Sequence, residues 1–123
     1  MSEHEEQVAV VEYCDLLSIP IFHIPNEAKR SPAVAARLKA EGLRPGIPDL
    51  CVPVAKGIFH SLYIEMKDEK GRLTDAQIEW LVRLRKEGMC AYCCKGAANA
   101  IELISRYMDE DESLCEQTRT LVQ

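Results

Sequence analysis

Two carboxylates and a lysine stand beside two neighbouring apolar runs of the chain. Asp49 precedes the run 50–54, and Glu65 and Lys67 follow the run 59–64. Carboxylates without a neighbouring His or Cys form a hard oxygen site that suits Mg²⁺ or Mn²⁺. An ion held in this way keeps several waters and takes phosphate oxygens of a substrate as further ligands. The three side chains therefore predict metal-assisted cleavage of a phosphodiester, provided that the fold brings them together.

A hairpin would bring the three side chains together. Both apolar runs have strand composition, and the Gly-containing turn 55–58 between them predicts an antiparallel pair. If the turn centres on Gly57, Asp49 lies opposite Glu65, and the Cβ atoms of such a pair are about 5 Å apart. Side chains alternate along a strand, so Lys67 shares a face with Glu65. The hairpin thus predicts one site at the edge of a sheet.

An ordinary surface ion pair is the alternative for these residues. Glu65 and Lys67 taken alone predict no more than a salt bridge, because such pairs are common. The Pro48-Asp49 dipeptide before one apolar strand, followed by the return of the hairpin, makes the pattern far more specific. In the metal site, Lys67 orients or helps to deprotonate the attacking water, or neutralises charge on the phosphate.

The ordered series of motifs resembles a known family. Pro48-Asp49, Glu65-x-Lys67 and Gln77 followed by Trp80-Leu81 are similar to the PD-(D/E)XK nuclease superfamily and, more narrowly, to the virus-type replication-repair nuclease (VRR-NUC) domain. The resemblance extends over residues 3–95. It implies an α/β, restriction-endonuclease-like core, in which helices flank a small mixed β-sheet. It also implies metal-dependent endonuclease cleavage of DNA, often at branched structures such as Holliday junctions, by a stand-alone homodimer.

The resemblance also assigns roles to individual residues. The catalytic residues it implies are Asp49, Glu65, Lys67 and Gln77. The metal ligands it implies are Asp49, Glu65, the main-chain carbonyl of Met66, and either Glu3 or Glu6. The spacing to Gln7 favours Glu3, although either acid also suits the positive end of a helix dipole. Gln77 can equally be the second half of a capping box that begins at Thr74.

Charge is unevenly distributed along the chain. The net charge is −5, and residues 109–116 hold five acids and no base, so the remainder is neutral. Residues 29–44 hold five basic side chains against one acid, a segment that can follow a phosphate backbone or form a solvated helix face. The candidate DNA-binding residues are Asn26, Lys29, Arg30, Arg37, Lys39, Arg44 and Arg72.

Periodicity and cap signals predict the remaining elements. Helices are expected at residues 4–18, 32–41, 75–87 and 97–107. Strands are expected at residues 19–24, 50–54, 59–64 and 89–94, which gives the order α-β-α-β-β-α-β-α. Residues 1–108 are predicted to form a single domain, and the acidic tail 109–123 is expected to be flexible. His23 is expected to pack within its apolar strand.

The cysteines and the N-terminal residues indicate the cellular compartment in which the protein is expected. Five of the six cysteines lie in apolar segments, where a reduced thiol behaves as a small hydrophobe, and Cys115 is the expected exposed thiol. The sequence shows neither a secretion signal nor an apolar run of membrane-spanning length. We therefore expect a cytoplasmic protein, in a bacterial or phage-infected cell by resemblance, with DNA as partner and Mg²⁺ or Mn²⁺ rather than an organic cofactor.

Other functions fit parts of the pattern. A catalytically silent DNA-binding or assembly module would keep the fold, but would be expected to lose Asp49, Glu65 or Lys67, all of which are present. A flap-type nuclease would keep the same site. A metal- or thiol-binding protein would use the cluster Cys90–Cys94, which lacks a second pair of ligands at zinc-site spacing.

Overall fold

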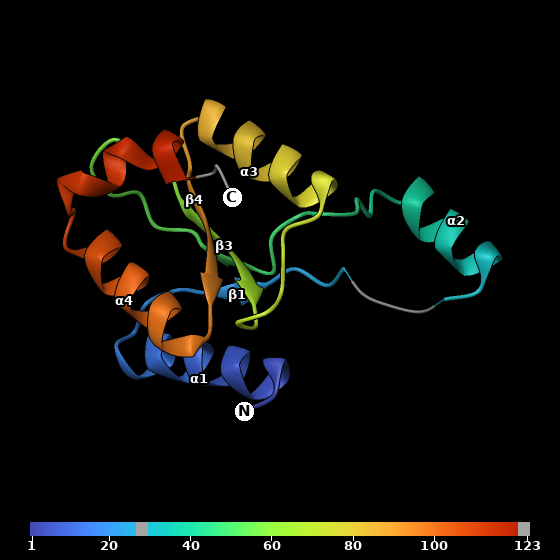
Figure 1. Ribbon diagram of the computed structural model, residues 1–123, viewed down its shortest axis with the longest axis horizontal. Coiled ribbons are helices and arrows are strands. Elements are labelled where there is room, and N and C mark those ends of the chain that lie inside the picture. Colours follow the sequence, from blue (N-terminus) through green and yellow to red (C-terminus); the bar gives the residue numbers. More distant parts are fainter. Residues whose placement is uncertain (27–29, 121–123) are drawn as a thin grey trace.

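A four-stranded mixed sheet forms the centre of the protein (Figure 1). The computed structural model describes residues 1–26 and 30–120, so the candidate DNA-binding residue Lys29 lies outside the described residues. The strands follow the spatial order β1 (Phe22–His23), β2 (Leu50–Val52), β3 (Leu62–Lys67) and β4 (Cys90–Lys95). Pairing is antiparallel from β1 to β3 and parallel between β3 and β4. The predicted α/β class and element order are confirmed.

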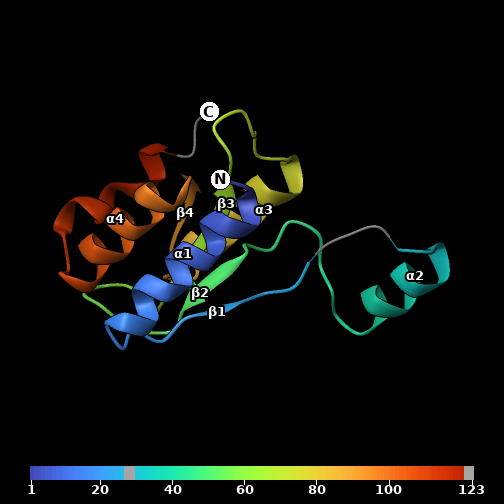
Figure 2. The ribbon, with the colours of Figure 1, turned by 90° about the horizontal axis from the view of Figure 1, so that it is seen from below.

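Helices cover both faces of this sheet. The α-helices of the described chain are α1 (Glu3–Leu16), α2 (Pro32–Ala40), α3 (Asp75–Lys86) and α4 (Ala97–Met108). α1 and α4 pack together on one face, whereas α3 covers the other (Figures 1 and 2). α2 projects away from the body in both views, and none of its residues is buried. No helix in the described part of the chain has the length and apolar character needed to cross a membrane.

The hairpin register is the one that the turn predicts. Leu50 pairs with Ile64 and Val52 with Leu62, so the register continues to Asp49 opposite Glu65. β2 is shorter than predicted because Pro53 cannot donate to the ladder. β3 begins later than predicted, and it extends to Lys67 because parallel pairing with β4 continues that far.

β1 is also shorter than the predicted strand 19–24. Only Phe22 and His23 pair with β2, because Pro20 and Pro25 on either side lack an N–H donor. The helix starts match their cap signals. Ser31 Oγ accepts a hydrogen bond from Val34 N at 3.2 Å before α2.

The core has two parts, one on each face of the sheet. Between the sheet and the pair α1 and α4, the buried residues include Val10, Leu62, Ile64 and Ile104. Between the sheet and α3, a smaller cluster centres on Leu81, Leu84 and Ala91. The site lies on the α3 face, which has less apolar packing.

The acidic segment after α4 contacts the rest of the chain. Leu114 is 2% exposed and belongs to the core, at the start of a 3-10 helix, Glu112–Thr120. Arg106 Nε donates to Asp111 Oδ2 at 2.8 Å. The flexibility expected of residues 109–123 concerns motion and stays a prediction, but Leu114 shows that part of this segment is packed onto the domain.

Candidate active site

Asp49, Glu65 and Lys67 meet where β2 begins and β3 ends. Asp49 Oδ2 accepts a hydrogen bond from the backbone N–H of Met66 at 2.8 Å, which holds this carboxylate across the hairpin. Lys67 Nζ lies 3.9 Å from Glu65 Oε2. Glu65 is 4% exposed, whereas Asp49 and Lys67 are half-buried. The structure thus brings the three predicted residues together.

Gln77 makes two contacts at once. Its Oε1 accepts from Thr74 N at 2.8 Å, and Thr74 Oγ1 accepts from Gln77 N at 3.2 Å, so the capping box at the start of α3 is complete. Its Nε2 donates to Glu65 Oε2 at 3.1 Å. One side chain therefore caps α3 and also reaches the buried carboxylate, and the catalytic role of Gln77 stays a prediction.

A glycine allows this approach between the strand and the helix. Gly46 has φ +88°, a left-handed conformation that glycine adopts without steric cost. A Cβ added to Gly46 would lie 2.5 Å from the main-chain carbon of Ala76, the neighbour of Gln77. Gly46 was not among the predicted site residues, although its place in Gly46-Ile47-Pro48-Asp49 was a signal.

Burial makes Glu65 unusual among the carboxylates. Desolvation, followed by the nearby charge of Asp49, raises the pKa of Glu65 from 4.5 to about 8, although the charge of Lys67 opposes the shift. A hydrogen bond with Asp49 and the charge of Glu3 act in the same direction as burial. Two carboxyl groups that repel each other in a partly dry site are a donor set that a hard divalent cation suits.

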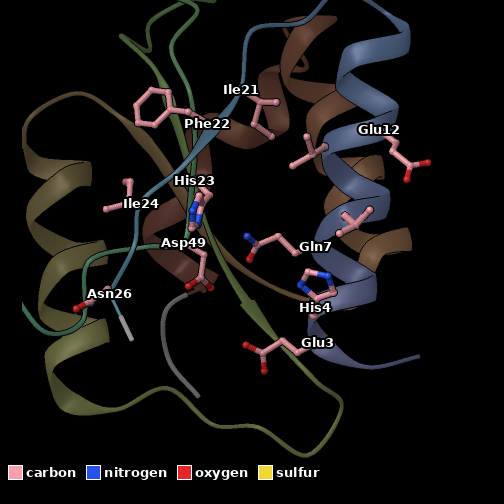
Figure 3. A pocket seen from close by; sticks show the side chains of 12 residues that line it. Glu3, His4, Gln7, Glu12, Ile21, Phe22, His23, Ile24, Asn26 and Asp49 are labelled. Atoms are coloured by element: carbon pink, nitrogen blue, oxygen red, sulfur yellow. The ribbon is translucent and has the colours of Figure 1, made fainter. Parts of the chain in front are cut away.

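A groove runs from this site between α1 and β1 (Figure 3). Its volume is about 580 Å³. Apolar side chains line it together with the polar residues Asp49, Glu3, His4, Gln7, Glu12, His23 and Asn26. Figure 3 shows Gln7 and His23 beside Asp49, with Glu3 on the same side of α1. The groove therefore opens next to the carboxylates.

His23 corrects our expectation of a packed strand residue. It is exposed and lines the groove, because β1 is an edge strand of two residues that pairs only with β2. An apolar run alone did not reveal that the strand would be so short.

Glu3 and Glu6 lie differently, although both lie in the first turns of α1. Glu3 is exposed at the groove that contains Asp49, and its charge reaches Glu65. Glu6 Oε2 instead accepts a hydrogen bond from Ala97 N at the start of α4. Of the two acids, Glu3 is therefore the one beside Asp49, and its part in metal binding stays a prediction.

The candidate DNA-binding residues are spread over the molecule. Asn26 is half-buried in the groove beside Asp49. Arg37 and Lys39 are exposed on the projecting α2, and Arg44 donates to the Lys39 carbonyl at 2.9 Å. Arg72 is exposed in the loop before α3, and Arg30 is half-buried before α2. Apart from Asn26, these residues do not gather at the carboxylates.

The donor set suits Mg²⁺ or Mn²⁺, which keep several waters, better than an ion whose ligands are all protein side chains. Among residues 1–26 and 30–120, no group of three or more His, Cys, Asp or Glu side chains is arranged to hold an ion. Mg²⁺ is commonly bound through one or two carboxylates, with waters and substrate phosphates as the other ligands. Asp49 and Glu65, with the main-chain carbonyl of Met66, can supply such a partial set.

The cysteines do not form a competing site. Cys90 and Cys94 are buried in the core under α1 and α4, whereas Cys93 packs toward α3, on the opposite face. All six thiols are free, and Cys115 is exposed as expected. The interpretation of this cluster as core packing is confirmed.

A mixed sheet with a buried glutamate, a second carboxylate and a lysine at one edge defines a nuclease domain of the PD-(D/E)XK type, with the restriction-endonuclease-like fold. The profile of the VRR-NUC domain matches residues 4–98, and the chain belongs to that family. Nucleases of this type bind DNA and generally use divalent metals.

Solved structures of VRR-NUC domains are similar to this chain. A solved structure described as a VRR_NUC domain protein is 34% identical, with a TM-score of 0.78, over 89% of this chain and 90% of its own. Another, described as a VRR_NUC domain, is 23% identical with a TM-score of 0.58, over 85% of this chain and 96% of its own, and shows the shared fold. No curated protein matches the chain.

Proposed function

We propose that the protein is a Mg²⁺- or Mn²⁺-dependent endodeoxyribonuclease that cleaves branched DNA, four-way junctions above all, as a homodimer. The observation that carries the reaction is the meeting of Asp49, Glu65, Lys67 and Gln77 at one edge of the sheet. A catalytically silent module would have no need of a buried, desolvated glutamate held by a glutamine and a lysine.

The side chains divide the work according to their contacts. Asp49 and Glu65 supply ligand oxygens, and the backbone N–H of Met66 holds the first of these carboxylates in place. Gln77 orients the second, because its amide donates to Glu65 Oε2. Lys67, 3.9 Å from the same oxygen, positions the attacking water and offsets negative charge on the phosphate.

A divalent ion would complete this site. When bound, it lowers the pKa of a coordinated water and stabilises the added charge on the scissile phosphate. The ligands we assign to it are Asp49, Glu65, the main-chain carbonyl of Met66 and, through water, Glu3. Desolvation and the charge of Asp49 disfavour the ionised form of Glu65, and a cation between the two carboxylates would offset both effects.

Branched DNA and a dimer are the finer parts of the proposal. α2 carries Arg37 and Lys39 away from an otherwise acidic body, where they can reach a phosphate backbone beyond the catalytic site. A two-fold dimer would present two such sites to a roughly symmetric four-way junction. A cytoplasmic location is part of the same proposal, and six free thiols suit a reducing compartment.

The test incubates labelled four-way junction, flap, duplex and single-stranded DNA with Mg²⁺, Mn²⁺ or EDTA. We expect junction cleavage that needs the metal and is lost in Asp49→Asn and Lys67→Ala. Asp15→Asn, an exposed carboxylate at the far end of α1, is the matched control and should cleave normally. Full activity of Asp49→Asn would refute the catalytic assignment. Preferred cleavage of flap DNA would refute the four-way junction as the main substrate. A monomer in analytical ultracentrifugation at working concentrations would refute the dimer.

A further inference from the structure

We propose that Glu6 is a positioning residue, which holds Glu3 at the metal site by capping α4. This inference deepens the proposed function and rests on it. It removes Glu6 from the candidate metal ligands and gives that side chain a different task, which links α1 to the strand end that carries Lys67.

The start of α4 takes its cap from another helix. Its N-cap residue is Gly96, which has no side chain to satisfy the first N–H groups of the helix. Glu6 Oε2, on α1, accepts from Ala97 N instead. A carboxylate at this position satisfies an exposed donor and also suits the positive end of the helix dipole.

Glycine at position 96 makes room for this contact. A Cβ added there would lie 3.0 Å from Glu6 Oε2, and Gly96 has φ +84°, which disfavours other residues. Gly96 N in turn donates to the main-chain carbonyl of Lys67 at 3.0 Å. The acceptor at Glu6 is therefore connected through two consecutive backbone N–H groups to the catalytic strand.

Glu3 is one turn before Glu6 on the same face of α1. Both line a second cavity of about 620 Å³, together with Met66 and Lys67. Glu3 also lines the groove that contains Asp49, so it faces both cavities, and its charge acts on Glu65. The capping box of Ser2 and Glu5 already holds the first turn of α1, so the contact of Glu6 with Ala97 has a different effect, which is to fix this turn relative to the strand that carries Lys67.

The test measures Mn²⁺ binding directly, by the loss of the free Mn²⁺ electron paramagnetic resonance signal, before any DNA is added. Residues that act on a metal from outside its direct ligands commonly contribute about 10- to 100-fold to metal affinity. Because Glu6→Ala would displace Glu3, which acts through water, we expect it to weaken Mn²⁺ binding by about tenfold. Glu6→Gln keeps an acceptor oxygen and should recover most of the affinity. Glu6→Asp keeps the charge but is shorter by one methylene, so it should resemble Glu6→Ala.

Two comparisons separate positioning from general damage. Asp15→Ala removes an exposed carboxylate from the same helix, outside the groove, and should bind Mn²⁺ as the wild type does. In a Glu3→Gln background, adding Glu6→Ala should change the affinity by less than about twofold, because the ligand that Glu6 positions is already gone. In cleavage assays at fixed Mn²⁺, Glu6→Ala should lower kcat and leave the KM for DNA unchanged.

Three outcomes would overturn the inference. The first is wild-type Mn²⁺ affinity in Glu6→Ala. The second is failure of Glu6→Gln to recover affinity although it is folded by circular dichroism. The third is an undiminished effect of Glu6→Ala in the Glu3→Gln background. If the wild-type protein neither binds Mn²⁺ nor cleaves any DNA, the proposed function itself has failed. Normal wild-type binding with any of the three outcomes refutes the role of Glu6 alone.

Discussion

The approach of Gly46 to the start of α3 predicts an unusually large effect for a small substitution. Gly46→Ala adds one methyl group, placed 2.5 Å from the main-chain carbon and 2.7 Å from the main-chain oxygen of Ala76. Backbone atoms cannot move aside by changing rotamer, so either the 46–49 segment or the first turn of α3 must shift. Both carry site residues, because Asp49 follows the glycine and Gln77 follows Ala76.

The expected magnitude has two parts. A left-handed conformation costs a residue with a Cβ about 1–2 kcal/mol. Forcing an added group into a packed contact costs about 1–3 kcal/mol more. Gly42→Ala is the matched control, because Gly42 also has positive φ, +111°, but an added Cβ there meets nothing within 4 Å. We therefore expect Gly46→Ala to lower the free energy of unfolding by about 1–3 kcal/mol more than Gly42→Ala.

Urea unfolding followed by circular dichroism measures this difference, from the midpoints at an unchanged slope. Cleavage is the second measurement. Misplacement of a catalytic group by about 1 Å can cost a hundredfold in rate, so Gly46→Ala should lose about that much activity while Gly42→Ala keeps most of it. Equal free energies of unfolding for the two variants would show that the contact with Ala76 is not tight, and the explanation of the strand–helix approach would be wrong.

Further predictions concern the carboxylates, the thiols and the basic helix. Because burial raises the pKa of Glu65 from 4.5 to about 8, the metal-free protein should lose stability as pH rises from about 5 to 8, and Glu65→Gln should flatten that slope in urea unfolding. For the same reason, Mn²⁺ affinity of the wild type should rise about tenfold per pH unit below about 8, because Glu65 must lose its proton when the ion binds. Calorimetry should detect the release of this proton, and a Mn²⁺ affinity that does not change with pH would contradict the raised pKa. Burial raises the pKa of Cys14 to about 11 and of Cys90 and Cys94 to about 12, whereas Cys115 is exposed. A thiol reagent at about pH 8 should therefore modify Cys115 first, and Cys115→Ser should remove the fast phase of the modification reaction. The double variant Arg37→Glu with Lys39→Glu should weaken DNA binding and lower its salt dependence, with unfolding unchanged; unaltered binding would remove α2 from the DNA interface.

The sequence predicted the parts of the site that depend on local rules. The register of Asp49 opposite Glu65 follows from the position of a turn and from the alternation of side chains, and both are short-range. The capping box of Thr74 and Gln77 likewise depends on four consecutive residues only. The parallel pairing of β3 with β4 agrees with their strand-helix-strand order, but no local pattern indicates that this pairing extends β3 to Lys67.

The remaining features depend on contacts between distant segments. Glu6 and Ala97 meet only because α1 and α4 pack together, and no local pattern around either residue indicates this. The exposure of His23 depends on how far Pro20 and Pro25 shorten an edge strand. Gly46 could have been recognised from its place before Pro48-Asp49, but the chain segment that approaches it is visible only in the fold.

The projecting helix α2 has a consequence for how substrate is held. None of its nine residues is fully buried, and helices shorter than about 12–15 residues are only marginally stable alone in water. If α2 binds DNA as proposed, the free energy of ordering this helix contributes to the free energy of binding. Helix propensity at Ala35 and Ala36, far from the carboxylates, thereby becomes a control on affinity, and a glycine at either position would loosen binding without touching the chemistry.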